Sequence, residues 1–477
     1  MAPTVVLPSA RRGRRAGPGL DRLAIIDDEG RRQKIQPADA HGRFERGKTP
    51  VRWFFIAVFM LLPWIDVGGH PAVLFDLPAR RLHLFGFLLG TGDLPLLFFV
   101  LISGAWVLVV VTALVGRVWC GWACPQTVTL EAVFRRIERV IEGSGHQRLA
   151  FDLAPWTAAK LGKKALKWSL WLVCSFVVAH VLLSYFVSLP AVVTMVLDDP
   201  REHWSAFVVA GVVTGLTYGN FAWFREQVCL IVCPYGRLQS ALQDSDSIVV
   251  GYDARRGEPR GALKEQTGGD CVDCRRCVQV CPTGIDIRNG LQMECIGCAA
   301  CIDACDDVMS KLHRPLGLVR YDSEASLAGG PRRLLRPRIV AYASIGLALA
   351  IVATTFALTR DTLVVRAVRL PGPLFALVDD GATVQNTVLV HVENRSSDEL
   401  VVSGALQQLP DGVQAIWPMV SRTLGPQERG DLPLIVRAPR ATVVEGREVR
   451  VVVVGVAGAV RHQAVINVRL FGPARQP

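Results

Sequence analysis

The sequence predicts a multidomain membrane protein with an α-helical transmembrane bundle of about five helices, an inserted cysteine-rich domain and a C-terminal all-β domain. Three observations support this fold class. Hydrophobic residues make up 51% of the 477-residue chain and form several long uncharged runs. All 13 cysteines lie between Cys120 and Cys305. Residues 362–470 contain short β-branched runs separated by turn residues.

Four apolar runs are long enough to cross the hydrocarbon core of a bilayer, which requires about 20 residues. They are residues 94–115, 168–197, 204–224 and 339–359. A fifth run, 51–65, is short and contains Pro63, so by length alone it also fits a re-entrant or interfacial segment. The charge pattern favours a fifth span.

The net charge of +11 arises largely from basic residues at the ends of apolar runs, which indicates membrane topology rather than a nucleic-acid surface. With five spans, residues 1–48, 117–167 and 225–338 lie on one side, and the positive-inside rule makes that side the cytoplasm. The periplasmic side then contains the loops around Asp76 and Asp198 and everything after Arg360. The protein is therefore predicted to be a multi-pass protein of the bacterial inner (cytoplasmic) membrane.

The N-terminal arginines Arg11, Arg12, Arg14 and Arg15 are not followed by an apolar segment, so they do not form an export signal. The predicted domains are a basic cytoplasmic tail at 1–48, transmembrane helices 1–4 at 49–225 with the cytoplasmic loop 117–167, a cytoplasmic cysteine-rich domain at 226–338, transmembrane helix 5 at 339–359 and a periplasmic β domain at 360–477. The β domain is predicted to be an immunoglobulin-like sandwich, and another small β-barrel remains the alternative.

The strongest motif is a doubled C-x2-C-x2-C-x3-C run, which begins at Cys271 and again at Cys295. In two-cluster ferredoxins, the first three cysteines of each run and the last cysteine of the other run bind one [4Fe-4S] cluster. One predicted ligand set is therefore Cys271, Cys274, Cys277 and Cys305, and the other is Cys295, Cys298, Cys301 and Cys281. Two zinc sites are the weaker alternative. The second run has Asp306 where the first has Pro282, which affects the local turn and not the ligands.

Two copies of a C-x3-C-P motif follow two of the predicted spans, as Cys120, Cys124 and Pro125 and as Cys229, Cys233 and Pro234. Cysteines four residues apart share one face of a helix, so two such helices can bring four thiols together. Thiolates favour Cu(I) or iron-sulfur sites, and the nearby Arg117, Arg225 and Arg237 are expected to lower the thiol pKa values. These four cysteines are therefore candidate catalytic residues and copper ligands, although buried structural thiols are the alternative.

Other single residues carry weaker signals. Cys174 stands alone in its span and is expected to pack as a small apolar side chain. His180 lies within the same span and is a functional candidate, although a hydrogen-bonded neutral histidine explains it equally well. His70 and His83 are weaker metal-ligand candidates. No G-x-G-x-x-G or H-E-x-x-H pattern occurs, so no nucleotide-binding or zincin site is predicted.

The order R-V-W-C-G-W-A-C-P, E-Q-V-C-L-I-V-C-P-Y-G-R, doubled cysteine run, last span and β-rich tail resembles the cytochrome c oxidase accessory protein family (FixG/RdxA/CcoG). The resemblance covers nearly the whole chain from about residue 48. It implies two [4Fe-4S] clusters and an oxidoreductase, a cupric reductase that converts Cu(II) to Cu(I) for assembly of cbb3-type cytochrome c oxidase. The eight ferredoxin cysteines would then bind the clusters, and Cys120, Cys124, Cys229 and Cys233 would contact copper or relay electrons to it.

The implied partners are the lipid bilayer, a cytoplasmic electron donor and subunits or assembly factors of the oxidase, with no nucleic acid. Two alternatives belong to other functional classes. One is an electron-transfer subunit resembling quinol dehydrogenases, which share the C-x3-C-P motif. The other is a non-catalytic assembly scaffold that docks oxidase subunits through the β domain. The membrane-edge thiols are also consistent with a third cluster or with a redox dithiol.

Overall fold

The computed structural model describes residues 35–67, 69–263, 268–369, 372–396, 398–406, 412–441, 443, 448–457 and 460–473. The chain forms two compact units. The first contains the described residues up to Ile65 together with Val100–Ile351, and the second contains Asp66–Phe99 and the described residues from Val352 onwards. The predicted loop before the span 94–115 therefore belongs to the same unit as the C-terminal β strands.

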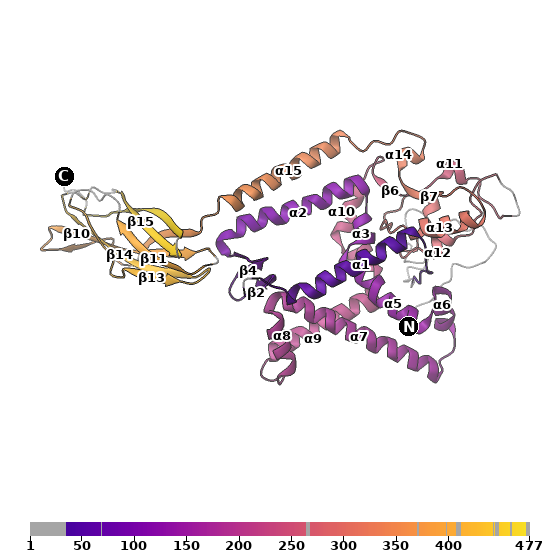
Figure 1. Ribbon diagram of the computed structural model, residues 1–477, viewed down its shortest axis with the longest axis horizontal. Coiled ribbons are helices and arrows are strands. Elements are labelled where there is room, and N and C mark those ends of the chain that lie inside the picture. Colours follow the sequence, from indigo (N-terminus) through magenta and orange to yellow (C-terminus); the bar gives the residue numbers. More distant parts are fainter. Residues whose placement is uncertain are drawn as a thin grey trace. The chain divides into compact units, whose positions relative to one another are not determined.

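Among the described residues, four helical segments are long and apolar enough to span a membrane: Leu94–Val115 (α2), Ala158–Val187 (α7), Trp204–Phe224 (α9, Trp204–Gly219, continued by the π-helix η4, Asn220–Phe224) and Pro337–Leu358 (α15). They confirm the four long predicted runs as helices. The fifth run forms the end of α1 (Arg43–Leu61) and the 3-10 turn η1 (Leu62–Trp64). Figure 1 shows α1 alongside α7.

The predicted apolar run 168–197 does not form one continuous helix. Helix α7 ends at Val187, and α8 (Leu189–Leu197) begins after Ser188, which has a φ of 75°. Pro190 lies in the first turn of α8. It has no backbone N–H, and in a continuous helix its ring would clash with the carbonyl group of residue 186, so the helix breaks before it. At the other end, α7 begins ten residues before the predicted run, where the Thr157 side chain accepts a hydrogen bond from the Lys160 backbone N–H at 3.2 Å.

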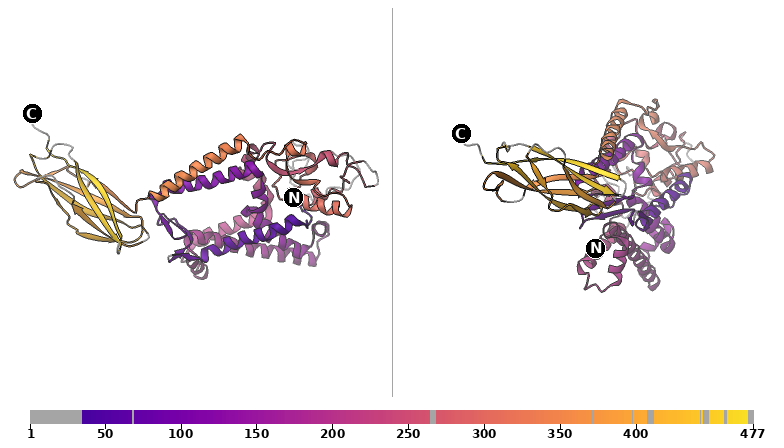
Figure 2. Two further views of the ribbon diagram at one scale, coloured as in Figure 1. Left: turned by 45° about the horizontal axis from the view of Figure 1, so that its top comes forward. Right: turned by 60° about the vertical axis from the view of Figure 1, so that its left-hand side comes forward.

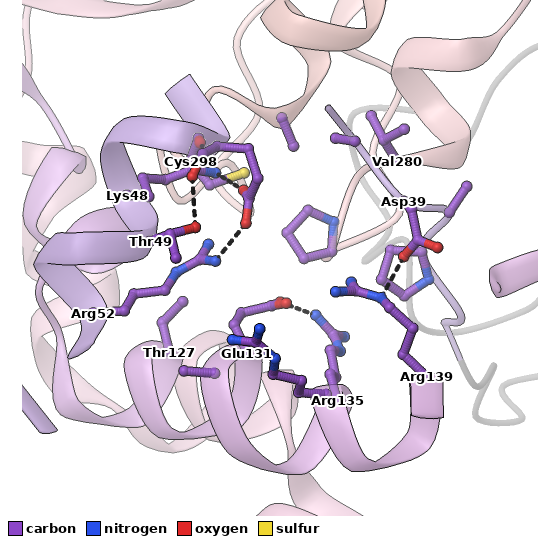
Figure 3. Close-up of a pocket in the computed structure, with 18 of the residues that line it drawn as sticks. Asp39, Lys48, Thr49, Arg52, Thr127, Glu131, Arg135, Arg139, Val280 and Cys298 are labelled. Carbon is purple, nitrogen blue, oxygen red and sulfur yellow. Dashed lines mark hydrogen bonds and ion pairs between the residues drawn. The ribbon is translucent and has the colours of Figure 1, made fainter. Parts of the chain in front are cut away.

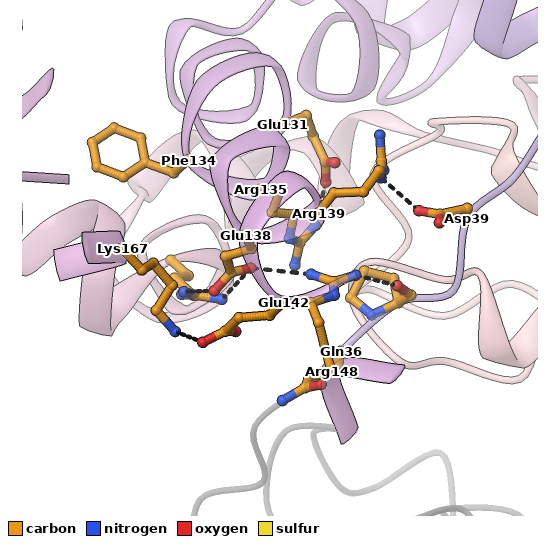
Figure 4. Close-up of polar contacts among 12 residues, drawn as sticks. Gln36, Asp39, Glu131, Phe134, Arg135, Glu138, Arg139, Glu142, Arg148 and Lys167 are labelled. Atoms are coloured by element: carbon orange, nitrogen blue, oxygen red, sulfur yellow. Dashed lines mark hydrogen bonds and ion pairs between the residues drawn. The ribbon is translucent and has the colours of Figure 1, made fainter. Parts of the chain in front are cut away.

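The predicted connection 117–167 between two spans is mainly helical over residues 117–153. The helices are α3 (Val118–Trp122), α4 (Pro125–Thr129), the π-helix η3 (Leu130–Phe134), α5 (Arg135–Glu142) and α6 (Gly145–Leu153). The buried carboxylates of α5 hold this region together (Figure 4): Glu138 accepts from Arg225 at 2.6 Å, and Glu142 from Lys167 at 2.7 Å. Buried charges are tolerated when they are paired in this way.

The cysteine-rich domain is built on a small antiparallel pair of strands, β6 (Ile248–Tyr252) and β7 (Val319–Ser323). Its buried core includes Val250, Ile302 and Met309, which are each at most 2% exposed. The remaining elements are η5 (Val228–Val232), α10 (Pro234–Leu242), α11 (Ala254–Gly257), α12 (Arg276–Gln279), η6 (Ile287–Asn289), α13 (Ala300–Lys311) and α14 (Glu324–Leu327).

The predicted N-terminal tail requires a correction at its C-terminal end. Residues 1–34 lie outside the described residues, but residues 35–48 are part of the fold. Ala38 donates a backbone hydrogen bond to Gln279 at 2.8 Å, and the Asp303 carboxylate accepts from the backbone N–H groups of Phe44 and Glu45 at the start of α1. A carboxylate is favourable at a helix N-terminus because it pairs with free N–H groups and with the helix dipole.

In the second unit, the residues after α15 form two antiparallel sheets that enclose one core (Figure 2). One sheet has the order β12-β14-β10-β8, with β9 also paired to β10, and the other has the order β13-β11-β15-β16. The strands are β8 (Leu363–Arg369), β9 (Ala376–Val378), β10 (Thr383–Asn394), β11 (Leu400–Leu406), β12 (Gln414–Ile416), β13 (Ser421–Leu424), β14 (Arg429–Pro439), β15 (Glu448–Ala457) and β16 (Val460–Arg469). The β-branched runs predicted in residues 362–470 are therefore found in strands.

The described part of the connection between α1 and α2 contains five short strands. They are β1 (Asp66–Val67), β2 (His70–Pro71), β3 (Val73–Asp76), β4 (Arg81–Leu84) and β5 (Phe87–Leu89), followed by η2 (Thr91–Asp93). Asp93, 4% exposed, binds Arg360 through two hydrogen bonds of 2.9 and 2.8 Å. Arg360 also donates to the carbonyl oxygens of Leu88 and Arg395. This buried ion pair joins the short strands to the β domain.

Replacing Asp93 by asparagine is expected to destabilise the second unit by about 3 kcal/mol, because it leaves the Arg360 guanidinium without its counter-ion in a buried site. The measurement is the thermal unfolding midpoint of the detergent-solubilised chain, with Asp361→Asn as the control, since Asp361 is exposed and adjacent to Arg360. Equal midpoints for the two variants would show that the ion pair does not hold this unit together.

Candidate functional site

The eight cysteines of the doubled run surround two small cavities. Cys271, Cys274, Cys277 and Cys305 line one of them, together with apolar side chains such as Met309 and Leu318. The second is lined by Cys281, Cys295, Cys298 and Cys301, and Cys277 borders it as well. Each cavity therefore receives three cysteines from one run and the last cysteine from the other. A cubane needs this donor set, so the residues present fit two [4Fe-4S] clusters.

The two runs share a local conformation that explains this arrangement. Arg275 and Ala299, which each follow the second cysteine of a run, have left-handed backbones with φ of 55° and 59°. A short helix begins directly after each of them, α12 in the first run and α13 in the second. The third and fourth cysteines of each run therefore lie on or next to a helix, and the first two lie on the loop before it.

Burial dominates the chemistry of these thiols. It raises the pKa of Cys277, Cys295 and Cys305 to about 12, and the charges of neighbouring cysteines add to this for each of them. For Cys305 the cysteine neighbours are Cys274 and Cys271, and for Cys295 they are Cys298 and Cys281. Free thiols of this kind stay protonated at neutral pH, so metal binding has to displace their protons.

The four membrane-edge cysteines do not lie on two continuous helices, which corrects the prediction. Cys120 is in α3, but Cys124 is the residue before α4 and has a ψ of 127°. Cys229 is in the π-helix η5, and Cys233 precedes α10 with a ψ of 113°. Pro125 and Pro234 explain both breaks, because proline disfavours a helical conformation in the residue before it and is favoured at the first position of the next helix.

These four thiols are nevertheless close enough to influence one another. The pKa of Cys229 is raised to about 12, first by burial and then by the charges of Cys124, Cys120 and Cys233. Burial also raises the pKa of Cys120, whose Sγ donates to Oε1 of Gln239 at 3.5 Å. Arg117 opposes both shifts without reversing them, so the expectation of lowered thiol pKa values was wrong for these two cysteines. Arg225 binds Glu138, and Arg237 is exposed.

Among the described residues, no three His, Cys, Asp or Glu side chains converge closely enough to hold one metal ion. The ligands of a cubane need not converge, because each cysteine binds a different iron. For a single copper ion at the membrane-edge thiols, the side chains would have to move together. Cys174, in contrast, packs in an apolar cluster with Phe134 and Trp171, as predicted. His180 bonds to the Phe176 carbonyl oxygen one turn earlier in α7, which supports its structural interpretation.

The first membrane-edge motif touches the second cysteine run directly. A Cβ atom added to Gly121 would lie 2.7 Å from Cα of Cys298 and 2.7 Å from the carbonyl oxygen of Ile296. Only glycine permits backbones to approach this closely. Gly297 has a φ of 65°, and a Cβ atom there would lie 3.1 Å from the backbone of Arg117. The thiol motif and the second ligand set are therefore in backbone contact.

Two buried cations from the helical elements bind backbone carbonyl groups in or just before the second run. Lys48 of α1 is 1% exposed, and its Nζ donates to the carbonyl oxygen of Cys298 at 2.7 Å. Arg117, 6% exposed, donates to the carbonyl oxygen of Met293 and to Oε1 of Gln239. Figure 3 shows Lys48 beside Cys298, with Arg52 on the same helix. Glu45 forms ion pairs with Lys48 and Arg52.

Sequence reasoning missed Lys48, Gly121 and Gln239 as site residues and gave Arg117 a role in thiol ionisation only. Gly121 lies inside the C-x3-C-P motif, so its position was a usable signal for a close backbone approach. Lys48 and Gln239 carry no such signal, because their contacts involve residues more than 100 positions away in the chain.

Replacing Lys48 by methionine is expected to lower the reduction potential of the second cluster by tens of millivolts. The buried cation stabilises the more negative, reduced form, and for one electron each tenfold change in the equilibrium is about 59 mV. The measurement is a redox titration followed by electron paramagnetic resonance. Lys311→Met is the matched control, because Lys311 is exposed on α13 and paired with Asp307. Equal potentials in both variants would exclude Lys48 as a source of this effect.

Comparison with known proteins agrees with this geometry. Residues 224–324 match the family model of a 4Fe-4S dicluster domain, and residues 96–142, which include Cys120 and Cys124, match that of a 4Fe-4S binding domain. The chain is 33% identical to the nitrogen fixation protein FixG of Rhizobium meliloti over 88% of this chain and 89% of that protein. It is 35% identical to protein RdxA of Cereibacter sphaeroides, over 83% of this chain and 86% of RdxA.

Protein RdxB of the same organism is 33% identical over 77% of this chain and 80% of RdxB. Identity at this level over most of both chains establishes a common family. The matched models also establish two [4Fe-4S] clusters as the cofactors of this protein. The chain therefore belongs to the FixG/RdxA family of membrane iron-sulfur electron-transfer proteins.

Proposed function

We propose that this protein is a cupric reductase, which converts Cu(II) to Cu(I) at the four membrane-edge thiols for assembly of a cbb3-type cytochrome c oxidase. The observation that carries this proposal is the backbone contact between Gly121 of the first thiol motif and Cys298 of the second cysteine run. The contact places the thiols next to one of the two ligand sets. The ligand sets are Cys271, Cys274, Cys277 and Cys305, and Cys281, Cys295, Cys298 and Cys301.

When bound, the two clusters supply one-electron chemistry between a cytoplasmic reductant and the thiols. Each Cu(II) substrate ion takes up one electron and becomes Cu(I), and the reductant loses that electron. The chain's own contribution is a soft ligand set, because thiolates bind Cu(I) more favourably than oxygen ligands do. The buried thiols Cys120 and Cys229 release their protons when copper binds, since metal coordination requires the thiolate.

Charge asymmetry supports a cytoplasmic position for the cysteine-rich domain in a bacterial inner membrane. Arg332, Arg333, Arg336 and Arg338 precede or begin α15, and the segments 117–167 and 225–338 are rich in basic residues. The end of α1 would be a fifth span, which is needed to put the basic N-terminal residues on the same side of the membrane as these segments. Exposed Trp53, Phe54 and Trp64 in this segment suit contact with lipid. The β domain would then be periplasmic.

We assign the β domain to the immunoglobulin type because the order of the strands in its two sheets is similar to that of immunoglobulin domains. Strands β8, β10 and β14 form one sheet in the order A-B-E, and β11, β15 and β16 form the other in the order C-F-G. The described part of this domain contains no cysteine. Its proposed role is to dock oxidase subunits or assembly factors.

Replacing Cys124 or Cys233 by alanine is expected to reduce the rate of Cu(II) reduction at least about tenfold, because loss of a ligand weakens metal binding. The assay follows anaerobic formation of Cu(I) with a specific chelator, using the purified chain charged with a chemical reductant, at unchanged iron content. Cys174→Ala is the matched control, since Cys174 packs in an apolar cluster. Unchanged rates in both test variants would make the thiols structural and favour quinol-dependent electron transfer or a scaffold role.

Replacing Gly121 by alanine is expected to slow Cu(II) reduction while both clusters remain bound, because the added Cβ atom pushes the thiol motif away from the second run. Gly162→Ala is the control, since a Cβ atom at Gly162 meets nothing within 4 Å. The measurement is the pre-steady-state rate at which the reduced clusters are reoxidised by Cu(II). A rate equal to that of the control would show that the contact does not matter for the reaction.

A further inference from the structure

A polar pocket in the first unit lies beside the second cysteine run and borders its cavity at Cys298. Its walls come from residues 37–41 and the first half of α1, from the helices α4 to α6, and from both cysteine runs (Figure 3). The pocket has a volume of about 210 Å³. Sites for drug-sized molecules usually begin at about 300 Å³, so this pocket suits a compact group.

Positive side chains outnumber negative ones in the described lining of this pocket. Three acidic residues line it, namely Asp39, Glu45 and Glu131. Six basic residues line it, namely Lys48, Arg52, Arg135, Arg136, Arg139 and Arg148. Figure 3 shows Arg52 on α1 facing Glu131 and Arg135 across the pocket. Such an excess of positive charge in a concave site attracts anions.

The ion pairs within the pocket leave part of this charge unbalanced. Glu45 alone serves two cations, Lys48 at 2.9 Å and Arg52 at 2.6 Å. Arg136 has no carboxylate partner among the described residues, and its guanidinium group lies 5.7 Å from the ring centroid of Trp53. The other three cations are paired: Arg139 with Asp39, Arg148 with Glu138, and Arg135 with Glu131 and Glu226.

The carboxylates of the pocket respond to this positive field. Burial by itself would raise the pKa of Glu45, but the charges of Lys48 and Arg52 bring that pKa below its usual value. Burial also acts to raise the pKa of Glu131, and Arg135 and Arg52 lower it in the same way. Arg52 therefore acts on carboxylates from both walls, so its charge is felt across the pocket.

The position of the pocket favours a lipid as the source of the anion. Trp53 belongs to the lining and is 44% exposed, and the next residue, Phe54, is 60% exposed. Both residues lie at the start of the apolar run 51–65, which is the proposed fifth span. Tryptophan is enriched at the membrane–water interface, and basic pockets at that depth bind anionic headgroups. A soluble anion would leave these aromatic side chains without an apolar partner.

We propose that this pocket binds the phosphate group of an anionic phospholipid, with Arg136 and Arg52 as the main contacts. Guanidinium groups suit this role because each can donate to two phosphate oxygens at once. The acyl chains of the lipid would lie along Trp53 and Phe54. The inference rests on the fifth span and goes beyond the proposed cupric reductase function, on which it does not depend.

The test is lipid binding to the full-length, detergent-solubilised chain, followed by native mass spectrometry during titration with phosphatidylglycerol. Phosphatidylcholine, which has no net charge, is the comparison lipid, and inorganic phosphate is added as a competitor. We expect Arg136→Gln to weaken phosphatidylglycerol binding about fivefold, since each basic residue near an anionic lipid contributes to the attraction. Arg136 is exposed, so its replacement should not unfold the chain, and iron content checks this.

Arg332→Gln is the matched control. It removes the same charge from an exposed residue just before α15, at the same edge of the membrane, but Arg332 is not part of the pocket lining. Equal affinity for phosphatidylglycerol in the unmodified chain and in Arg136→Gln would overturn the proposal. So would an equal loss in Arg332→Gln, which would show general attraction to basic residues. Phosphatidylcholine binding as tight as that of phosphatidylglycerol would exclude an anion site, and displacement of the lipid by equimolar inorganic phosphate would refute the lipid assignment.

Discussion

The close backbone contact between Gly121 and the second cysteine run sets much of the arrangement of the first unit. It requires glycine on one side, and a left-handed glycine, Gly297, within the opposing loop. Once these backbones are in contact, Arg117 reaches the carbonyl oxygen of Met293, and Trp122 bonds to the Tyr321 hydroxyl at 3.1 Å. Tyr321 in turn donates to the Gly297 carbonyl oxygen at 2.5 Å. A thiol motif, a strand of the cysteine-rich domain and a ligand loop are thus fixed as one piece.

Electrostatics distinguishes the two ligand sets. Two buried cations lie beside the second set. Lys48, which also pairs with Glu45, donates to the carbonyl oxygen of Cys298, and Arg117 donates to that of Met293, just before the run. The first set includes Cys274, which is exposed, and its nearby Arg288 is neutralised by Asp286 and Asp273. Buried cations raise a reduction potential, whereas solvent and paired charges have smaller effects. A higher potential in the second set, which Arg117 favours, would direct electrons towards the set that lies next to the thiol motif.

Local patterns in the sequence predicted most of the chemistry and only part of the structure. The spacing of the doubled run was sufficient for the two ligand sets, because the rule for sharing the fourth cysteine depends on chain order alone. The four spans followed from length and hydropathy. Strand β16 was not predicted. Its polar residues Arg461, His462, Gln463 and Asn467 interrupt the alternation of apolar and polar residues that identifies a half-exposed edge strand. The short strands between α1 and α2 were missed because each has at most four residues.

The prolines of the C-x3-C-P motifs show why spacing alone misled us about the thiols. Four residues suggest one helical face, but Pro125 and Pro234 end the helix before the second cysteine of each motif. The second thiol is then held on an extended residue at the start of a new helix and not within a rigid turn. Such a thiol can move relative to its partner with little loss of helical hydrogen bonding. This freedom would suit the copper ion of the proposed reaction, which has to be bound and released, whereas the cluster ligands are held at two defined cavities.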